Sequence, residues 1–206
     1  MNFDKKAQEW DKSTQRLKRA EIIAKEINNF IKPNQKLNAL EFGCGTGLLS
    51  FNLKNSFKTI FLADTSKGMI DVLKKKIEIQ GIKNFIPLQT DLLSEKPQFP
   101  SIDVIYTLMT LHHIPDINHT FNILNSILTM NGYFCIADLV KEDGSFHSHI
   151  KDFDGHNGFE KEELSKMLNQ SGFEVKYYSE CFEIEVNEDG KNLKYPLFLM
   201  ICRKIS

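Results

Sequence analysis

Between residues 37 and 140, short apolar runs alternate with amphipathic stretches, and this alternation constrains the fold more than any other feature of the sequence. The runs are short and apolar, as parallel strands buried on both faces are. Strands that alternate with helices form a parallel sheet with helices on both faces. The pattern therefore predicts an α/β fold. The predicted strands are Leu37–Phe42, Thr59–Ala63, Phe85–Gln89, Ile102–Thr107 and Tyr133–Leu139.

The segments between these strands carry helix signals at their ends. Lys67–Gln80 has apolar residues at three- and four-residue steps and stops before Gly81, a residue suited to close a helix. Pro115 suits the first turn of the next helix. The apolar face of that helix is expected to hold Ile117, Phe121, Leu124, Ile127 and Leu128.

A further helix is predicted before the first strand, packed beside the sheet. Ser13 or Thr14 can cap it, and it is expected to run to about Phe30. Its inward residues are expected to be Leu17, Ala20, Ile23, Ala24 and Ile27.

A polar segment, residues 141–158, follows the fifth strand and is too long for a simple connector. It holds three of the six histidines, four Asp or Glu residues, Phe146 and Phe153. Long loops inside compact domains are usually functional or disordered. We therefore expect this segment to contribute to function.

The chain is predicted to end in a helix and a hairpin. Glu160–Gln170 has a helical pattern closed near Gly172. Two strand-like runs follow, Phe173–Val186 and Tyr195–Arg203, joined around Asp189-Gly190. A hairpin places antiparallel strands in the sheet, so the sheet is expected to be mixed.

Charge and cysteine content exclude several classes of protein. The 26 Lys and Arg residues against 27 Asp and Glu give a net charge of −1, without the basic excess of a general nucleic-acid binder or a polybasic membrane anchor. The four cysteines form no C-x-x-C pair, which disfavours a cysteine-based zinc site or a disulfide framework of the small secreted kind. The first residues lack an apolar signal region, and no run is long enough to span a membrane. We expect a reducing, cytoplasmic compartment.

The most informative motif is Leu40-Glu41-Phe42-Gly43-Cys44-Gly45-Thr46-Gly47, where a predicted strand meets a predicted helix. Glycines at alternate positions let the backbone turn sharply and leave room for a ligand. A dinucleotide fingerprint would need glycine at position 48, which is Leu48, and no Lys-Ser or Lys-Thr pair completes a P-loop. A nucleoside ligand without phosphates remains, and it suits Glu41.

Two further acids follow predicted strands and meet the glycine turn at the same edge of the sheet. Asp64 ends the second strand, where an acidic side chain can accept hydrogen bonds from ribose hydroxyls; capping the next helix is the alternative. Asp91 follows the third strand and can accept from an adenine amino group. Three acids around one crevice favour a nucleoside site.

These motifs resemble the class I (seven-stranded) S-adenosylmethionine-dependent methyltransferases, in particular the small single-domain group that acts on small molecules. The resemblance extends from about Phe3 to Cys202. It implies a doubly wound, Rossmann-like sheet of seven mostly parallel strands that ends in an antiparallel hairpin. The matching segments are Glu41–Gly47, Leu62–Asp64 with Met69, Thr90–Leu92, Ile102–Ile105, Leu111–Ile114 and Gly158–Phe159.

One segment departs from the family pattern. Where the family often has Lys-Pro-Gly-Gly before the fifth strand, this chain has Leu128-Thr129-Met130-Asn131-Gly132. Asn131 can replace glycine where φ is positive. We expect only a change of loop away from the crevice.

The resemblance also implies how the cofactor is held. The glycine loop would lie under the methionine part, Asp64 would hold the ribose, Met69 would flank the adenine and Asp91 would bond its amino group. The product would be S-adenosylhomocysteine. The expected cofactor-binding residues are Glu41, Gly43, Cys44, Gly45, Gly47, Asp64, Thr65, Met69, Asp91, Leu92 and Thr107.

A sulfonium methyl group is already activated, so the enzyme's main task is to hold the acceptor in line with the breaking bond. No catalytic triad is required. His112 and His113 follow the fourth strand beside the glycine turn. His112 is the candidate catalytic residue, as a contact to the acceptor or as its proton acceptor. Trp10 either belongs to a lid over the crevice or anchors a helix.

The chain is expected to form one methyltransferase domain over residues 1–206. Residues 1–32 would form a helical lid and residues 37–140 the cofactor-binding core. Residues 141–158 would help to form the acceptor site, and residues 159–206 the C-terminal helix and hairpin.

The predicted activity is methyl transfer to a small-molecule acceptor, without nucleic-acid or membrane partners. A nicotinamide-dependent oxidoreductase, which Leu48 opposes, and a non-catalytic binder of S-adenosylmethionine are the alternatives. No metal is expected, because His147, His149 and His156 match no ligand pattern. The acceptor, its reacting atom and the choice between a monomer and a homodimer are left open.

Overall fold

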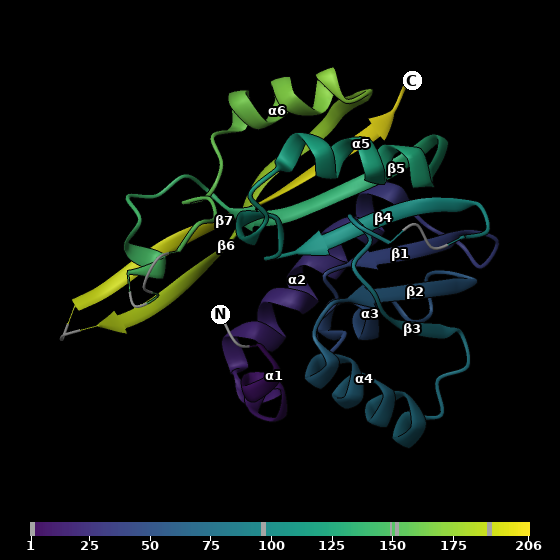
Figure 1. Cartoon of the computed structure of the whole chain (residues 1–206), viewed down its shortest axis with the longest axis horizontal. Helices are drawn as coiled ribbons and strands as arrows, with labels where there is room; N and C mark the ends of the chain where they lie inside the picture. The colour runs from purple at the N-terminus through teal and green to yellow at the C-terminus, as the bar shows by residue number, and fades with distance from the viewer. Residues whose placement is uncertain (1–2, 96–97, 149, 151–152, 189–190) are drawn as a thin grey trace.

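The structure is a computed structural model that describes residues 3–95, 98–148, 150, 153–188 and 191–206. A seven-stranded sheet has the strand order β3-β2-β1-β4-β5-β7-β6. Strands β1 to β5 run parallel, and β7 is antiparallel to both β5 and β6. The predicted fold class, a mostly parallel α/β sheet with an antiparallel hairpin at its end, is confirmed (Figure 1).

The five parallel strands carry the apolar runs seen in the sequence. Four of them match the prediction to within one residue at each end, but β5 begins at Leu128, which pairs with Ile102. Leu128 therefore belongs to this strand and not to the preceding helix. Asn131 has a φ of 65°, the positive value expected of it. The strands are β1 (Asn38–Phe42), β2 (Thr59–Asp64), β3 (Phe85–Gln89), β4 (Ile102–Leu108) and β5 (Leu128–Leu139).

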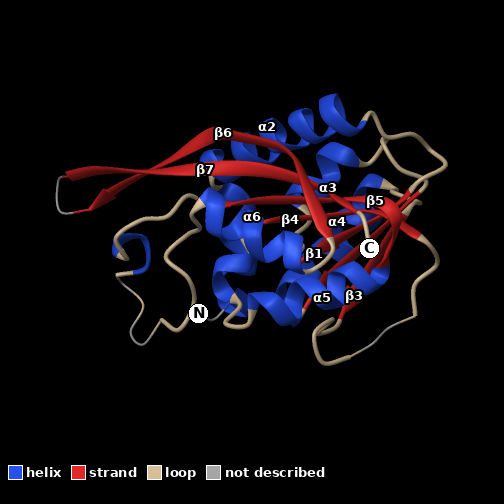
Figure 2. Cartoon of the chain, turned by 90° about the horizontal axis from the view of Figure 1, so that it is seen from above, coloured by secondary structure: helices blue, strands red, loops and turns tan. Residues whose placement is uncertain are grey.

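The hairpin strands β6 (Phe173–Glu188) and β7 (Lys191–Lys204) are longer than predicted at their joined ends. Pairing continues to Asn187 opposite Asn192. The predicted turn at Asp189-Gly190 lies outside the described residues. Figure 2 shows that this end of the hairpin projects beyond the helices.

Helices cover both faces of the sheet, with a buried apolar core under each face. Ile23, Leu49 and Leu73 belong to one core, and Phe121 and Leu168 belong to the other. Figure 1 shows α5 and α6 on one side of the sheet and α2, α3 and α4 on the other. The helices are α1 (Phe3–Lys6), α2 (Thr14–Ile31), α3 (Leu48–Leu53), α4 (Lys67–Gln80), α5 (Ile117–Ile127) and α6 (Lys161–Gln170).

Local signals determine most helix ends. The Ser13 side chain accepts a hydrogen bond from Arg16 N and caps α2, as predicted. Helix α4 has its predicted bounds, because Ser66 caps its start and Gly81 closes it with a φ of 63°. Two expectations were wrong. Pro115 precedes Asp116, the cap of α5, so it lies outside the helix, and Leu17 of α2 is 44 % exposed instead of inward.

Short 3-10 segments connect these elements at the edge where the parallel strands end. They are η1 (Ala7–Lys12), η2 (Leu111–His113) and η3 (Ser145–His147). No helix among the described residues is both long and apolar enough to cross a membrane.

Candidate active site

A cavity of about 420 Å³, here called the strand-end cavity, lies where β1, β2, β3 and β4 end. Ligands of open α/β sheets bind at this edge, because the connections diverge there. Nine residues predicted to bind the cofactor line this cavity. They are Glu41, Gly43, Cys44, Gly45, Asp64, Thr65, Met69, Asp91 and Leu92.

Two residues predicted at the cofactor, Thr107 and Gly47, are not among the lining residues. Thr107 is buried in β4, and its Oγ1 donates to the carbonyl oxygen of Phe42 over 2.8 Å. Gly47 precedes the first residue of α3 with a φ of 82°. In the structure Thr107 ties β4 to β1, and Gly47 shapes the turn; a contact of either residue with the cofactor stays a prediction.

The glycine loop is attached to β2 by its own backbone. The amides of Gly43 and Cys44 both donate to the carbonyl oxygen of Ala63, over 2.9 and 3.0 Å. Gly43 has a φ of 69°, and a Cβ there would overlap the side chain of Thr110. The first glycine is therefore required by both conformation and space.

Asp64 holds the loop from the other side. Its Oδ2 accepts from the amide of Gly45 over 2.7 Å, and its Oδ1 accepts from the amide of Ser66 over 2.8 Å. Burial raises the pKa of this carboxyl, while these backbone hydrogen bonds act in the opposite direction. Ser66, and not Asp64, caps α4, so the alternative of a capping role is wrong. Each carboxylate oxygen has a second lone pair for a ligand hydroxyl.

Asp91 is positioned in a similar way after β3. Its Oδ1 accepts from the amide of Leu93 over 3.0 Å, and its Oδ2 accepts from Ser94 Oγ over 2.9 Å. These bonds orient the carboxylate beside the buried Leu92. The expected contact to an adenine amino group stays a prediction.

Glu41 lies at the base of the cavity and is buried. Its carboxylate accepts a hydrogen bond from Ser50 Oγ, which also lies 2.6 Å from Tyr106 Oη. Burial raises the pKa of Glu41 to about 8, although the hydrogen bond from Ser50 acts in the opposite direction. The site thus contains a carboxyl group poised to lose a proton when a cation binds nearby.

The N-terminal segment supplies four residues that line the cavity and that were not among the predicted cofactor-binding residues: Phe3, Trp10, Arg16 and Arg19. The Arg16 guanidinium lies 3.9 Å from the Trp10 ring centroid and donates to the Trp10 carbonyl oxygen over 3.2 Å. Arg19 Nε is buried and has no hydrogen-bond partner among the described residues. Burial lowers the pKa of Arg19 to about 10. Trp10, in η1, lies over the crevice as the lid alternative predicted, whereas Arg16 and Arg19 lie in α2, far from the glycine motif in sequence, and carried no signal of this role.

A second cavity, of about 470 Å³, adjoins the first and is here called the hairpin cavity. Residues of β6 and β7, η3 and the N-terminal segment line it, together with His112. The two cavities share six lining residues, which form the boundary between them. These are Phe3, Trp10, Arg16, Arg19, Met109 and His113.

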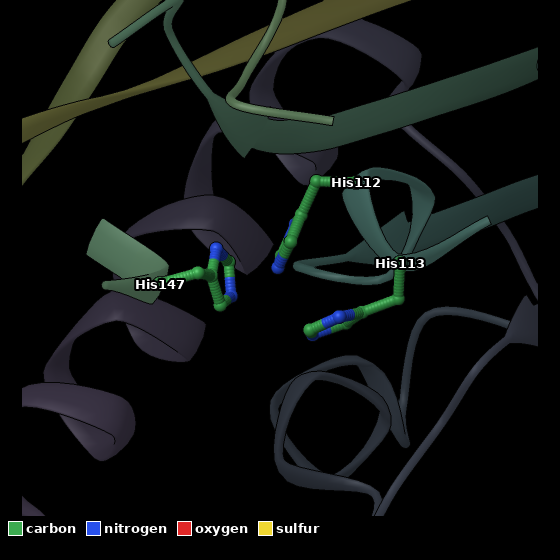
Figure 3. A group of neighbouring side chains, drawn as sticks. All are labelled: His112, His113 and His147. Carbon is green, nitrogen blue, oxygen red and sulfur yellow. The ribbon is translucent and has the colours of Figure 1, made fainter. Parts of the chain in front are cut away.

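Three histidines gather at this boundary: His112 and His113 from η2, and His147 from η3 (Figure 3). Nδ1 of His112 lies 2.5 Å from Oδ1 of the buried Asp138. Burial opposes ionisation of Asp138, but the adjacent His112 and the hydrogen bonds it accepts hold its pKa below the ordinary value. Burial lowers the pKa of His113 to about 3.

The segment 141–158 brings His147 to this place. Its ends are held together by hydrogen bonds from Lys141 N to Phe159 O and from Glu142 N to Asn157 O, of 3.1 and 2.9 Å. His156 lies apart from the cluster, with Nε2 3.0 Å from the carbonyl oxygen of Ile114. Of the three histidines considered in the sequence, His149 lies outside the described residues. The cluster has no local spacing signal, because its members come from two segments.

The sequence matches the family described as a methyltransferase domain over residues 15–178. The chain belongs to this family. The match covers most of the chain and includes the glycine loop, both strand-end acids and the histidine pair. The resemblance to S-adenosylmethionine-dependent methyltransferases is thereby confirmed, and with it S-adenosylmethionine as the cofactor.

Relatives and solved structures agree with this assignment. An uncharacterized methyltransferase of Schizosaccharomyces pombe is 32 % identical over 131 residues, which cover 60 % of this chain and 46 % of that protein. This methyltransferase chain spans about half the length of the named relatives that it matches.

Two solved structures show the same fold. A candidate methyltransferase in complex with the Haloferax volcanii Trm112 methyltransferase activator has a TM-score of 0.79 at 17 % identity, with 99 % of this chain and 98 % of that chain covered. An S-adenosylmethionine-dependent methyltransferase from Clostridium acetobutylicum has a TM-score of 0.70 at 15 % identity, with 92 % of each chain covered.

The lining of the strand-end cavity fits the chemistry of S-adenosylmethionine. The buried Arg19 Nε, which has no partner among the described residues, can donate to a carboxylate. Asp64 and Asp91 can accept from ribose hydroxyls and an adenine amino group. Glu41 provides a carboxylate for a cationic group. The lining thus offers groups suited to a carboxylate, to hydroxyl and amino donors and to a cation.

Proposed function

We propose that this methyltransferase transfers a methyl group from S-adenosylmethionine to a small-molecule acceptor bound in the hairpin cavity. The observation that carries the proposal is the adjoining pair of cavities, one lined by the cofactor residues and the other by β6, β7 and η3. The volume of the hairpin cavity, about 470 Å³, suits a small molecule. A cytoplasmic location belongs to the same proposal.

The reacting groups would meet at the boundary of the two cavities, near Met109 and His113. S-adenosylmethionine supplies a methyl group on a positively charged sulfur, which an electron-rich atom of the acceptor takes by in-line displacement. The protein contributes by holding that atom in line and by excluding water. His112, oriented by Asp138, would direct its free ring edge toward the acceptor.

The N-terminal segment would act as the lid over this boundary. Asp11 joins it to the cofactor half of the protein: its Oδ1 accepts from Thr46 Oγ1 and its Oδ2 from Lys76 Nζ, each over 2.5 Å. Lys76 Nζ also donates to the Thr46 carbonyl oxygen over 2.9 Å. These bonds hold Trp10 beside the glycine loop, where it lines both cavities.

Calorimetry with three ligands tests the cofactor part of the proposal. S-adenosylmethionine and S-adenosylhomocysteine should bind with one site per chain, and NAD should bind far more weakly. Tighter binding of NAD would overturn the proposal in favour of an oxidoreductase. Incubation with a broad panel of small molecules should then give methylated products by mass spectrometry. Binding of the cofactor without any turnover would favour a non-catalytic binder.

A pair of substitutions tests whether the acceptor occupies the hairpin cavity. Ile184→Trp fills part of that cavity, whereas Ile79→Trp changes a residue of α4 that is 74 % exposed. We expect Ile184→Trp to raise the KM for the acceptor at least tenfold and to leave the Kd for S-adenosylhomocysteine within about twofold. Equal kinetics for the two variants would place the acceptor elsewhere.

A further inference from the structure

The three histidines at the cavity boundary have the geometry of a metal site. Each of His112, His113 and His147 offers one ring nitrogen, and these nitrogens all lie within 4.8 Å of one another. Figure 3 shows the three rings around a common space, with His147 approaching from a different segment than the other two. Three imidazoles bound to one zinc ion at about 2.0–2.1 Å would have nitrogens about 3.3 Å apart. Each pair of nitrogens would need to approach by at most about 1.5 Å to reach that spacing.

A second observation supports the same interpretation. His112 is buried and its Nδ1 is engaged by Asp138 Oδ1 over 2.5 Å, so Nε2 is the nitrogen that faces a ligand. A metal-binding histidine almost always uses its other nitrogen in this way, because the hydrogen bond fixes the tautomer and the ring orientation. Asp138 is itself held by the amides of His112 and Leu139, over 3.3 and 2.8 Å. Backbone amides thus hold Asp138, and Asp138 in turn orients His112.

We propose that His112, His113 and His147 bind one divalent first-row transition metal, with Zn²⁺ as the reference ion. Neutral imidazoles suit zinc, iron, copper and nickel, whereas magnesium and calcium prefer oxygen ligands. The carboxylate of Asp138 offsets part of the charge that the ion brings into this buried place.

Three protein ligands leave at least one coordination position open, as in catalytic zinc sites. All three histidines line the hairpin cavity, so the open position faces the proposed acceptor. The metal therefore selects acceptors whose reacting atom is a thiol or hydroxyl. Coordination forms a bond from the metal to sulfur or oxygen, breaks the S–H or O–H bond and releases the proton to water. This acceptor class rests on the proposed function; the metal site rests on the histidine geometry alone.

Metal titration of the full chain, purified without a histidine tag and treated with a chelator, tests the site. Co²⁺ is added without acceptor or cofactor, and its visible absorption is followed. Zn²⁺ content after gel filtration is measured in parallel. We expect one equivalent of metal per chain, with tetrahedral or five-coordinate Co²⁺ absorption. If the folded wild-type protein binds less than one equivalent of Co²⁺ or Zn²⁺, the proposal is overturned.

Variants identify the ligands. His113→Ala and His147→Ala should each weaken metal binding at least tenfold, and Asp138→Asn should weaken it by about 10- to 100-fold as a positioning residue. The control is His119→Ala, which removes an exposed histidine of α5 and should leave the affinity unchanged. Circular dichroism and a cooperative thermal transition show that each variant is folded, and His113, which is only half-buried, is the safest of the three ligands to replace.

Two results separate this proposal from the proposed function. Unchanged metal affinity in the folded His113→Ala and Asp138→Asn variants would mean that the histidines only pack against rings such as Phe153, which stacks on His147 at 4.0 Å. The methyltransferase proposal would then still stand on binding of S-adenosylhomocysteine. Stoichiometric metal binding without turnover of any thiol or hydroxyl compound would uphold the metal site and refute its link to the acceptor.

Discussion

Gly43 is the residue on which the cofactor loop depends most directly, because both its φ of 69° and the nearby Thr110 side chain oppose a Cβ. Gly81 provides a matched control, since it has a φ of 63° and an open surrounding. We expect Gly81→Ala to cost about 1 kcal/mol of unfolding free energy from backbone strain alone. Gly43→Ala should cost about 1–3 kcal/mol more, because Thr110 must move. Urea unfolding checks both values, and equal costs would refute the steric argument.

Glu41 gives the protein a pH dependence with a defined sign. Its pKa is about 8 in the folded protein against an ordinary value of 4.5. Between these values the folded state binds more protons than the unfolded state, so stability falls as pH rises, by at most about 1.4 kcal/mol per unit. Glu41→Gln stays neutral and should remove this part of the slope.

Denaturant unfolding at pH 6, 7 and 8 without cofactor measures the slope in both proteins. The comparison isolates Glu41, since every other titrating group is common to wild type and variant. A slope that is the same in both would show that Glu41 is already ionised in the folded state.

The residues predictable from sequence are those whose role follows from a local motif. The glycines, Asp64 and Asp91 were found because each follows a strand, and the parallel sheet brings strand ends together. Arg19 was not predicted at the site, and His147 was expected in the acceptor segment but not beside His112 and His113. Their positions depend on how α2 and residues 141–158 fold back on the sheet. Thr107 lies near a strand end, but its side chain hydrogen-bonds to the neighbouring strand, and the strand pattern alone does not reveal this.

At the scale of elements, the docking of α1 onto α4 depends on one carboxylate. Asp4 Oδ1 accepts from Ser66 Oγ over 2.6 Å and from Gly68 N over 2.8 Å, at the start of α4. Asp4→Ala should loosen residues 3–12 and raise the Kd for S-adenosylhomocysteine several-fold. Global stability should change little, because Asp4 lies at the exposed end of the segment.

Asp71→Ala is the control for this experiment. It removes an exposed ion pair of α4, between Lys67 and Asp71 at 2.5 Å, and leaves both hydrogen bonds of Asp4 in place. Hydrogen exchange of α1 and calorimetry should distinguish the two variants. Equal cofactor affinities would show that the segment closes over the cavity without this contact.

Elements with signals at both ends were predicted best. Helix α4 was predicted to the residue because Ser66 and Gly81 mark its limits. The start of β5 was missed because Leu128 continues the helical period of α5, and only its pairing with Ile102 draws it into the sheet. Leu17 fits the inward pattern of α2 by spacing, but it lies in the first turn of the helix and stays 44 % exposed.

For the whole molecule, burial across the sheet predicts an order of stability. Strand β4 lies between β1 and β5 and is largely buried, whereas β3 is at the edge, with Ile86 40 % exposed. Amides of β4 should exchange with solvent deuterium at least tenfold more slowly than those of β3. Peptide-resolved hydrogen exchange measures both. Equal rates would indicate that the sheet opens only as a unit.

The β6–β7 hairpin allows mutations that change the acceptor to occur apart from mutations that change cofactor binding. The hairpin residues that line the hairpin cavity do not line the strand-end cavity. Mutations of these residues therefore leave the residues around the cofactor unchanged. The hairpin residues are Ile184, Glu185, Val186, Asn187 and Tyr195. Selection for a new acceptor can act on these codons alone. A library randomised at these positions should yield methyltransferases that methylate new acceptors and bind S-adenosylhomocysteine with unchanged affinity.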